Sequence, residues 1–237
     1  MSKQPSQSHT DELRSFGRRR GRKFSDSQTA LMNDVLPCVR LDLDAAVPKS
    51  LAALFNPVVE DVWLEIGFGG GEHLLWQAEH NRDVGLIGCE PFEDGVVKVL
   101  RGVEDQALAN VRVHDDDARD VLRWLPEASI SRAFVLFPDP WPKARHRKRR
   151  LVNTSLLNAL ARVMCEGGEL RIGTDIGDYA RWMMIALQEA DVFEWTAKRP
   201  DDWRKRPGDW PQTRYEQKAR REGRCCYFLS LKKKQSV

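Results

Sequence analysis

The sequence predicts an α/β fold in which a mostly parallel sheet carries helices on both faces. Three observations lead to this prediction. Short apolar runs rich in β-branched and aromatic residues, typical of buried strands, alternate with segments of helical spacing. The first run leads into a glycine-rich turn and a helical segment, the opening unit of nucleotide-binding α/β folds. Acidic residues stand at the ends of the predicted strands, which meet at one edge of a parallel sheet.

Length and composition are those of one globular domain with extensions. The chain has 237 residues, 41% of them hydrophobic, and a formal net charge of +3. No apolar run approaches membrane-spanning length, and the polar first ten residues lack the apolar core of a signal peptide. The five cysteines form no Cys-x-x-Cys pair, so we expect a reduced, cytoplasmic protein without a zinc site or disulfide framework.

A basic arm is predicted at the start of the chain. Residues 1–30 are polar, carry clustered arginines and show no sustained period. We therefore divide the chain into a flexible arm, 1–30, and a single domain, 31–237. The composition of the arm is compatible with a solvated tail and with a segment that orders on RNA or on the folded domain.

The first strand, turn and helix follow a weakly patterned segment. Residues 62–66 are a buried-strand run, 67–71 are the glycine-rich turn, and 72–78 have helical character. The glycines allow positive φ angles and close approach of a ligand to the backbone. A second strand at 85–90 ends on Glu90, where an acid can hold the two hydroxyls of a ribose.

The middle of the chain repeats this alternation. We expect a helix near 93–104, a strand at 111–114, an acidic cluster at 115–117 and a helix around 118–124. These elements complete the first half of a parallel sheet with crossover helices.

The most distinctive stretch follows the central strand, 133–137. Three prolines within residues 137–143 prevent both a helix and continued strand pairing, and Asp139 stands at their centre. A basic run, 143–150, comes next. A rigid loop at the end of a strand, with one carboxylate beside clustered cations, suits chemistry on a polyanion. The alternative is a proline-rich surface turn with a solvated charge run.

The remaining chain continues the pattern to its end. Apolar spacing predicts a helix at 151–164, which glycines 167–168 would close as a C-cap. A fifth strand, 169–173, ends on Thr174 and Asp175. After it we expect a helix at 179–190, a polar and basic segment with interleaved aromatic residues at 195–222, and a last strand at 224–231.

The acids restrict the kind of ligand that this edge can bind. The turn lacks the third glycine of the dinucleotide fingerprint G-x-G-x-x-G, because Glu72 occupies that position. Glu65, just before the turn, would repel a pyrophosphate but attract an ammonium or sulfonium group. S-adenosylmethionine offers both cations, a ribose diol for Glu90 and an adenine amine for Asp117. This is the layout of a class I methyltransferase.

With these motifs in place, the chain resembles the tRNA (guanine-N7-)-methyltransferase family, whose fold is Rossmann-like. The resemblance extends from about residue 40 to 231, and its most specific parts are the proline-tryptophan loop and a Thr-x-x-Glu motif. The matching segments are 64–69, 88–91, 116–118, 137–143, 173–175 and 213–216.

The resemblance implies a function and a set of site residues. The reaction would be methyl transfer from S-adenosylmethionine to N7 of a guanine in the tRNA variable loop, position 46, with S-adenosylhomocysteine as product. The implied cofactor ligands are Glu65, Gly67, Gly69, Glu90, Asp117 and Asp139, and Asp139 would also be catalytic. The target nucleotide would contact Lys143, Asp175, Thr213, Arg214, Tyr215 and Glu216, and the tRNA would contact Arg145, His146, Arg147, Lys148, Arg149 and Arg150. No metal is expected, and the protein would be a monomer or a homodimer.

The chemistry of guanine indicates what the acids would do. N7 carries a lone pair and no proton, so it can attack a methyl group directly and positioning should dominate catalysis. We expect Asp139 to accept a hydrogen bond from guanine N1–H or the exocyclic amine. Structural roles stay open for three other acids: a salt bridge for Glu65, an N-cap for Asp175, and a capping box of Thr213 with Glu216.

Two other functions are compatible with the same fold. One is methylation of a different RNA base, such as an exocyclic amine, because amino methyltransferases carry a related proline motif after the fourth strand. The other is a non-catalytic RNA-binding module. The presence of acids at all the expected positions argues against that module.

Overall fold

The start of the domain is helical. The computed structural model describes residues 17, 19–21 and 23–235. A capping box of Ser25 and Gln28 begins α1 (Asp26–Ala30), which continues through a π-helical turn into α2 (Leu36–Val39). The helical segment thus crosses the boundary predicted at residue 30. Most of the predicted arm lies outside the described residues, and its flexibility stays a prediction.

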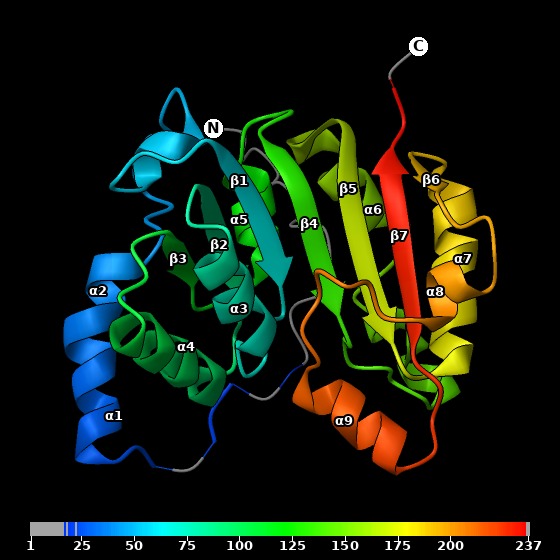
Figure 1. Ribbon diagram of the computed structural model, residues 1–237, viewed down its shortest axis with the longest axis horizontal. Helices are drawn as coiled ribbons and strands as arrows, with labels where there is room; N and C mark the ends of the chain where they lie inside the picture. Colours follow the sequence, from blue (N-terminus) through cyan, green and yellow to red (C-terminus); the bar gives the residue numbers. More distant parts are fainter. Residues whose placement is uncertain (1–16, 18, 22, 236–237) are drawn as a thin grey trace, which may run out of the picture.

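The described residues form one seven-stranded sheet in the order β3-β2-β1-β4-β5-β7-β6 (Figure 1). Strands β1 to β5 pair in parallel, whereas β7 runs antiparallel to both of its neighbours. The mostly parallel sheet that the sequence predicts is therefore confirmed. The strands are β1 (Asp61–Ile66), β2 (Val84–Cys89), β3 (Val111–His114), β4 (Ile130–Leu136), β5 (Met164–Thr174), β6 (Phe193–Trp195) and β7 (Tyr227–Lys233).

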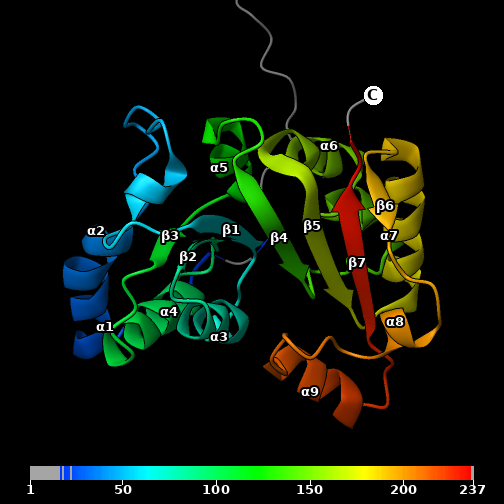
Figure 2. The same ribbon diagram turned by 45° about the horizontal axis from the view of Figure 1, so that its top comes forward.

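Helices cover both faces of the sheet (Figures 1 and 2). One face packs against α2, α3 (Glu72–His80), α4 (Glu93–Asp105) and the π-helical turn before α2. The other packs against α5 (Ala118–Trp124), α6 (Thr154–Val163) and α7 (Gly177–Ala190). The short α8 (Asp201–Arg204) and α9 (Arg214–Arg221) precede β7, and α9 lies below the carboxyl ends of β4 and β5 in the view of Figure 1.

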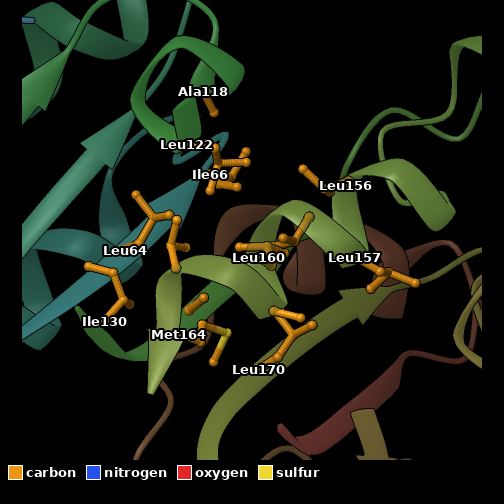
Figure 3. Close-up of a cluster of buried hydrophobic side chains, with 14 of the residues drawn as sticks. Leu64, Ile66, Ala118, Leu122, Ile130, Leu156, Leu157, Leu160, Met164 and Leu170 are labelled. Atoms are coloured by element: carbon orange, nitrogen blue, oxygen red, sulfur yellow. The ribbon is translucent and has the colours of Figure 1, made fainter. Parts of the chain in front are cut away.

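Alternation along β1 decides which side chains reach the site. Leu64 and Ile66 point into the core cluster that Figure 3 shows, together with Leu122 of α5 and Leu160 of α6. Neighbouring residues of β1 therefore point to the opposite face. That register places Glu65 toward α3, in line with its contact to that helix.

The glycine pair at 167–168 is the clearest departure from the predicted elements. It does not cap α6, which ends at Val163 with Met164 already extended. Gly167 has a φ of 70° and lies inside β5, where the pairing with β4 changes register between Ile130 and Arg132. The C-cap prediction is wrong because this pair forms a strand irregularity and not a helix end.

The polar segment 195–222 also holds more structure than its composition indicates. α9 buries only Glu216 and Ala219, so its sequence has no apolar stripe from which a helix could be predicted. Among the described residues, no helix is both long enough and apolar enough to cross a membrane.

Candidate active site

The glycine turn follows the carboxyl end of β1. At this strand the order of the sheet changes direction, with β2 and β3 on one side and β4 and β5 on the other. This is where ligands bind in open α/β sheets. Gly67 has a φ of 74°, and a Cβ added there would meet nothing within 4 Å. The turn therefore leaves open space beside a backbone that only glycine adopts easily.

Glu65 lies at the base of this space with its side chain buried. One carboxylate oxygen, Oε2, accepts a hydrogen bond from Nδ1 of His73, at 2.7 Å, across the glycine turn. The salt bridge considered from the sequence is thus a histidine contact, and neither Lys nor Arg pairs with Glu65 in the part of the chain that the structure describes.

Glu90 follows β2 and faces the same turn. Its Oε2 accepts from the backbone N–H of Gly69 at 2.7 Å, and its Oε1 accepts from that of Phe92 at 3.0 Å. Burial raises the pKa of Glu90, the two N–H groups oppose this, and the charges of Asp139 and Glu65 raise the pKa further. Three of the predicted acids are therefore close enough to interact electrostatically.

Asp139 occupies the proline loop after β4. Phe137 and Trp141, on either side of it, have φ angles of 51° and 42°. Residues other than glycine rarely adopt such positive values. Two hydrogen bonds hold the loop: Phe137 N–H donates to Gly173 O at 2.7 Å, and Arg150 Nε donates to Pro140 O at 2.9 Å. Asp139 makes no hydrogen bond or ion pair with any described residue. The residue as a whole is exposed, but protein atoms around its carboxyl partly desolvate it and raise its pKa.

Asp117 is the N-cap of α5. Its Oδ1 accepts from the backbone N–H and Nε of Arg119, at 3.0 Å and 2.9 Å. Burial raises the pKa of Cys89, the last residue of β2, and the charges of Asp117 and Glu90 raise it further. The structure thus assigns Asp117 a capping role at the predicted edge.

The first turn of α9 covers the glycine turn. Arg214 forms an ion pair with Glu72, and a Cβ at Gly69 would lie 3.3 Å from the ring of Tyr215. Desolvation, followed by the charges of Glu90 and Asp139, raises the pKa of Tyr215. α9 therefore brings two predicted nucleotide contacts over the acids, although it is distant in sequence.

Only half of the predicted capping box forms at α9. Thr213 Oγ1 accepts from the backbone N–H of Glu216 at 3.3 Å. The Glu216 carboxylate does not return the bond; it accepts from Arg220 Nε at 2.9 Å and pairs with Arg206 at 3.1 Å. Thr213 and Glu216 are both buried, so they hold the helix in place.

Asp175 lies at the end of β5 but does not cap α7. Its Oδ2 accepts from Arg224 Nε at 2.8 Å. The N-cap of α7 is Ile176, whose backbone N–H donates to Thr174 Oγ1 at 3.3 Å. The capping alternative for Asp175 is wrong, because its carboxylate instead pairs with Arg224 in the loop before β7.

A small cavity joins these elements. It has a volume of ≈ 10 Å³, room for about one water molecule, and its walls include Glu65, Gly67, Phe137, Thr213 and Tyr215. Residues from β1, the glycine turn, the proline loop and α9 thus meet around one space. Among the described residues, no cluster of His, Cys, Asp and Glu side chains is arranged to hold a metal ion.

The basic run lies beside the proline loop as a 3-10 helix, Ala144–Arg149. Lys143, Arg145 and Lys148 are exposed. Arg147 donates to Asp178 at 3.2 Å, and the guanidinium of Arg149 lies 5.1 Å from the Trp141 ring centroid. His146 also contacts that ring, edge-on at 5.9 Å.

Arg150 departs from the rest of the run. Its side chain is 1% exposed, pairs with Asp178 and lies 4.8 Å and 5.3 Å from the ring centroids of Tyr179 and Trp182. A buried guanidinium cannot contact RNA at the surface, so the expectation for Arg150 is corrected: it anchors the proline loop.

The sequence pattern did not identify His73 as the partner of Glu65. The only signal was its position in the first turn of the helix after the glycine turn. The contact with Glu65 forms because the glycine turn folds α3 back against β1, and the local sequence pattern does not predict this contact.

Comparisons with known proteins place the chain in a family. Residues 59–229 match the family described as "Putative methyltransferase". A tRNA (guanine-N(7)-)-methyltransferase of Chelativorans sp. (strain BNC1) is 47% identical over 216 residues, 91% of this chain and 93% of that protein. One of Agrobacterium fabrum (strain C58 / ATCC 33970) is 43% identical over 228 residues, 94% and 98% of the two chains.

Solved structures agree at the level of the fold. The 16S rRNA methyltransferase KamB superposes with a TM-score of 0.53 at 14% identity, over 75% of this chain and 89% of that one. The [4+2]-cyclase SpnF superposes with a TM-score of 0.52 at 15% identity, over 88% and 93%. Together with the extent and identity of the sequence matches, the Rossmann-like sheet and its edge of acids show that this chain belongs to the tRNA (guanine-N(7)-)-methyltransferase family.

Proposed function

We propose that the protein transfers a methyl group from S-adenosylmethionine to N7 of a guanine in the variable loop of tRNA. The observation that carries this proposal is that two acids flank the glycine turn: Glu65 lines the cavity beside Gly67, and Glu90 accepts from the N–H of Gly69. The Asp139 charge also raises the pKa of Glu90. Family membership supports the same reaction, since the relatives are named for it.

The residues present suit S-adenosylmethionine. Open space at Gly67 admits a ligand to the backbone, and Glu65 supplies a buried carboxylate for an ammonium group. Each oxygen of Glu90 accepts one backbone N–H and retains a lone pair for a ribose hydroxyl. The Tyr215 ring lies against Gly69 and has to turn aside to admit an adenosyl group. When bound, the cofactor supplies an electrophilic methyl group on a sulfonium.

Asp139 orients the acceptor base in this proposal. Its carboxylate accepts from guanine N1–H and the exocyclic amine, which directs N7 toward the methyl group and stabilises the cationic product. The absence of a competing partner among the described residues leaves it available for that contact. The two hydrogen bonds that fix the loop keep the geometry ready before tRNA binds.

The other predicted nucleotide contacts divide by exposure. Lys143, Arg214 and Tyr215 are exposed, and Asp175 is half-buried beside Arg224, so these side chains can reach a base or its phosphate. Thr213 and Glu216 are buried and act by holding α9. The exposed cations of the basic run bind phosphates, which provides affinity and register but no base identity.

A matched pair of substitutions separates phosphate contact from loop anchoring. Lys148→Ala removes an exposed cation, so it should weaken tRNA binding, reduce the salt dependence of log Kd by about 1, and leave stability unchanged. Arg150→Ala removes a buried, hydrogen-bonded side chain and should lower the free energy of unfolding by roughly 2–4 kcal/mol. Filter binding across a salt series and urea unfolding measure the two effects. Equal stability losses in both variants would contradict the assignment.

Methyl transfer to unmodified tRNA tests the proposed function. Labelled S-adenosylmethionine is incubated with the protein and tRNA, and the product is cleaved chemically at 7-methylguanosine. Label at one variable-loop guanine supports the proposal. Label at a base that resists this cleavage would instead indicate another methylation, and cofactor binding without label would indicate an RNA-binding module.

A further inference from the structure

A chain of buried polar side chains lies behind Glu65, and the reaction chemistry above does not use it. His73 and Gln77 are 2% and 1% exposed. His73 Nε2 lies 3.1 Å from Gln77 Nε2, and Gln77 Nε2 lies 2.8 Å from the backbone oxygen of Asp209. Buried polar groups that connect in series constrain one another's orientation.

The carbonyl at the far end sets the direction of every bond in the chain. A backbone oxygen only accepts, so the atom of Gln77 that faces Asp209 must be its NH2 group. Asn81 Nδ2 lies 3.1 Å from Gln77 Oε1 and donates to it, which agrees with that orientation. The side-chain amide of Gln77 therefore has one arrangement.

This arrangement determines where the proton of His73 lies. The second N–H of Gln77 donates to His73 Nε2, so Nε2 carries a lone pair. The ring proton is then on Nδ1, which donates to Glu65 Oε2 at 2.7 Å. Edge contacts to Phe134 and Trp210, with ring centroids 4.5 Å and 5.7 Å away, hold the imidazole in this plane.

Asp209 is itself fixed to the sheet. Its carboxylate accepts from Arg171 Nη1 at 2.8 Å and lies 3.7 Å from Arg132 Nη1. The carbonyl that orients Gln77 thus belongs to a loop bound to β4 and β5. The same loop leads into α9, which covers the cofactor space.

We propose that His73 is a positioning residue, held as the neutral Nδ1–H tautomer, that orients Glu65 for the cofactor's ammonium group. A neutral donor occupies Oε2 without cancelling the carboxylate charge, and no described residue donates to Oε1. Because Glu65 lines the cavity, Oε1 is the oxygen that can meet a cation. This inference rests on the proposed function, in which Glu65 is a cofactor ligand.

The tautomer is measured directly by ¹⁵N NMR of protein labelled in its histidine rings. The His73 signal is assigned by its loss in His73→Asn. The structure predicts a protonated Nδ1 and an unprotonated Nε2 at neutral pH, and Gln77→Leu should alter the Nε2 signal. Protonation of both nitrogens, or of Nε2 alone, would overturn the proposal whether or not the protein methylates tRNA.

The positioning role is tested by two variants of similar size. His73→Leu removes the donor, whereas His73→Asn retains an N–H near the position of Nδ1. We expect His73→Leu to raise Kd and KM for S-adenosylmethionine about 10- to 100-fold, with kcat at saturation changed by less than about 3-fold, and His73→Asn to recover most of the affinity. Equal affinity of the two variants and wild type, with intact circular dichroism, would contradict the proposal. A wild-type protein that fails to bind the cofactor would instead refute the proposed function.

Discussion

Asp139→Ala is expected to lower kcat for tRNA methylation by about 10- to 150-fold while leaving the fold intact. A hydrogen bond to a charged group contributes about 1.5–3 kcal/mol, and here it would be strongest as the purine acquires positive charge. Asp139 is exposed and bonds to no described residue, so its removal breaks no structural contact. Single-turnover rates and urea unfolding measure the two quantities.

A matched control is Asp191→Asn at the end of α7. Asp191 has a φ of 52°, which asparagine tolerates well. It is the C-cap of α7, at the end of that helix remote from Asp175 and the candidate site. Wild-type activity is expected for this variant. Loss of stability in Asp139→Ala comparable to its loss of activity would show that the residue is structural.

The same residue predicts a pH dependence. Desolvation raises the pKa of Asp139, and the active form is the carboxylate, so the rate should be maximal above that pKa and fall as pH drops through it. The Asp139 charge also raises the pKa of Glu90. Asp139→Asn should therefore lower the pKa of Glu90, so that the loss of cofactor affinity on acidification occurs at a lower pH than in wild type. An unchanged pH dependence of cofactor affinity would contradict the proximity of the two acids.

Glu65→Gln is expected to weaken S-adenosylmethionine binding about 30- to 100-fold. The substitution keeps the size of the side chain and an oxygen that can accept from His73, but it removes the buried charge that an ammonium group would pair with. Isothermal titration with the cofactor measures the effect. Glu79→Gln, on the exposed face of α3, should bind like wild type.

A neutral cofactor analogue distinguishes an effect of the Glu65 charge from an effect of Glu65 on the shape of the site. An adenosine derivative without the amino group should bind wild type and Glu65→Gln with similar affinity, since neither can form the ion pair. If Glu65→Gln also weakens that analogue, the residue acts on the shape of the site and its role as an ammonium ligand is wrong.

Much of the fold follows from local pattern because its central strands are buried on both faces. The runs at β1, β2 and β4 are mainly apolar and buried, with Glu65 as the one acid inside the run 62–66 of β1, and the proline loop ends β4 by removing backbone donors. The ends of some strands were not predicted because they contain polar residues. β4 begins at Ile130, before the apolar run starts, and β7 continues into Lys232 and Lys233, because strand pairing extends through them.

The residue pattern predicted the acids and the glycine turn of the candidate site, and the family resemblance added Thr213 and Tyr215 of its wall. Glu65, Glu90 and Asp139 each follow from strand position, since parallel strands end at one edge. The coverage by α9, the burial of Arg150 and the pairing of Asp175 with Arg224 depend on contacts between distant segments. A basic run reads as a uniform surface, and only the fold distinguishes the arginine that turns inward.

The most direct measurement of the proposed chemistry uses a tRNA whose variable-loop guanine is replaced by 7-deazaguanine. This base keeps the Watson–Crick edge that Asp139 would bind but has a carbon where N7 carries its lone pair. With labelled S-adenosylmethionine, we expect one methyl group on the parent tRNA and none on the substituted tRNA, which should still bind with unchanged affinity. Methylation of the substituted tRNA at the same nucleotide would contradict N7 as the acceptor and indicate transfer to another atom, such as the exocyclic amine.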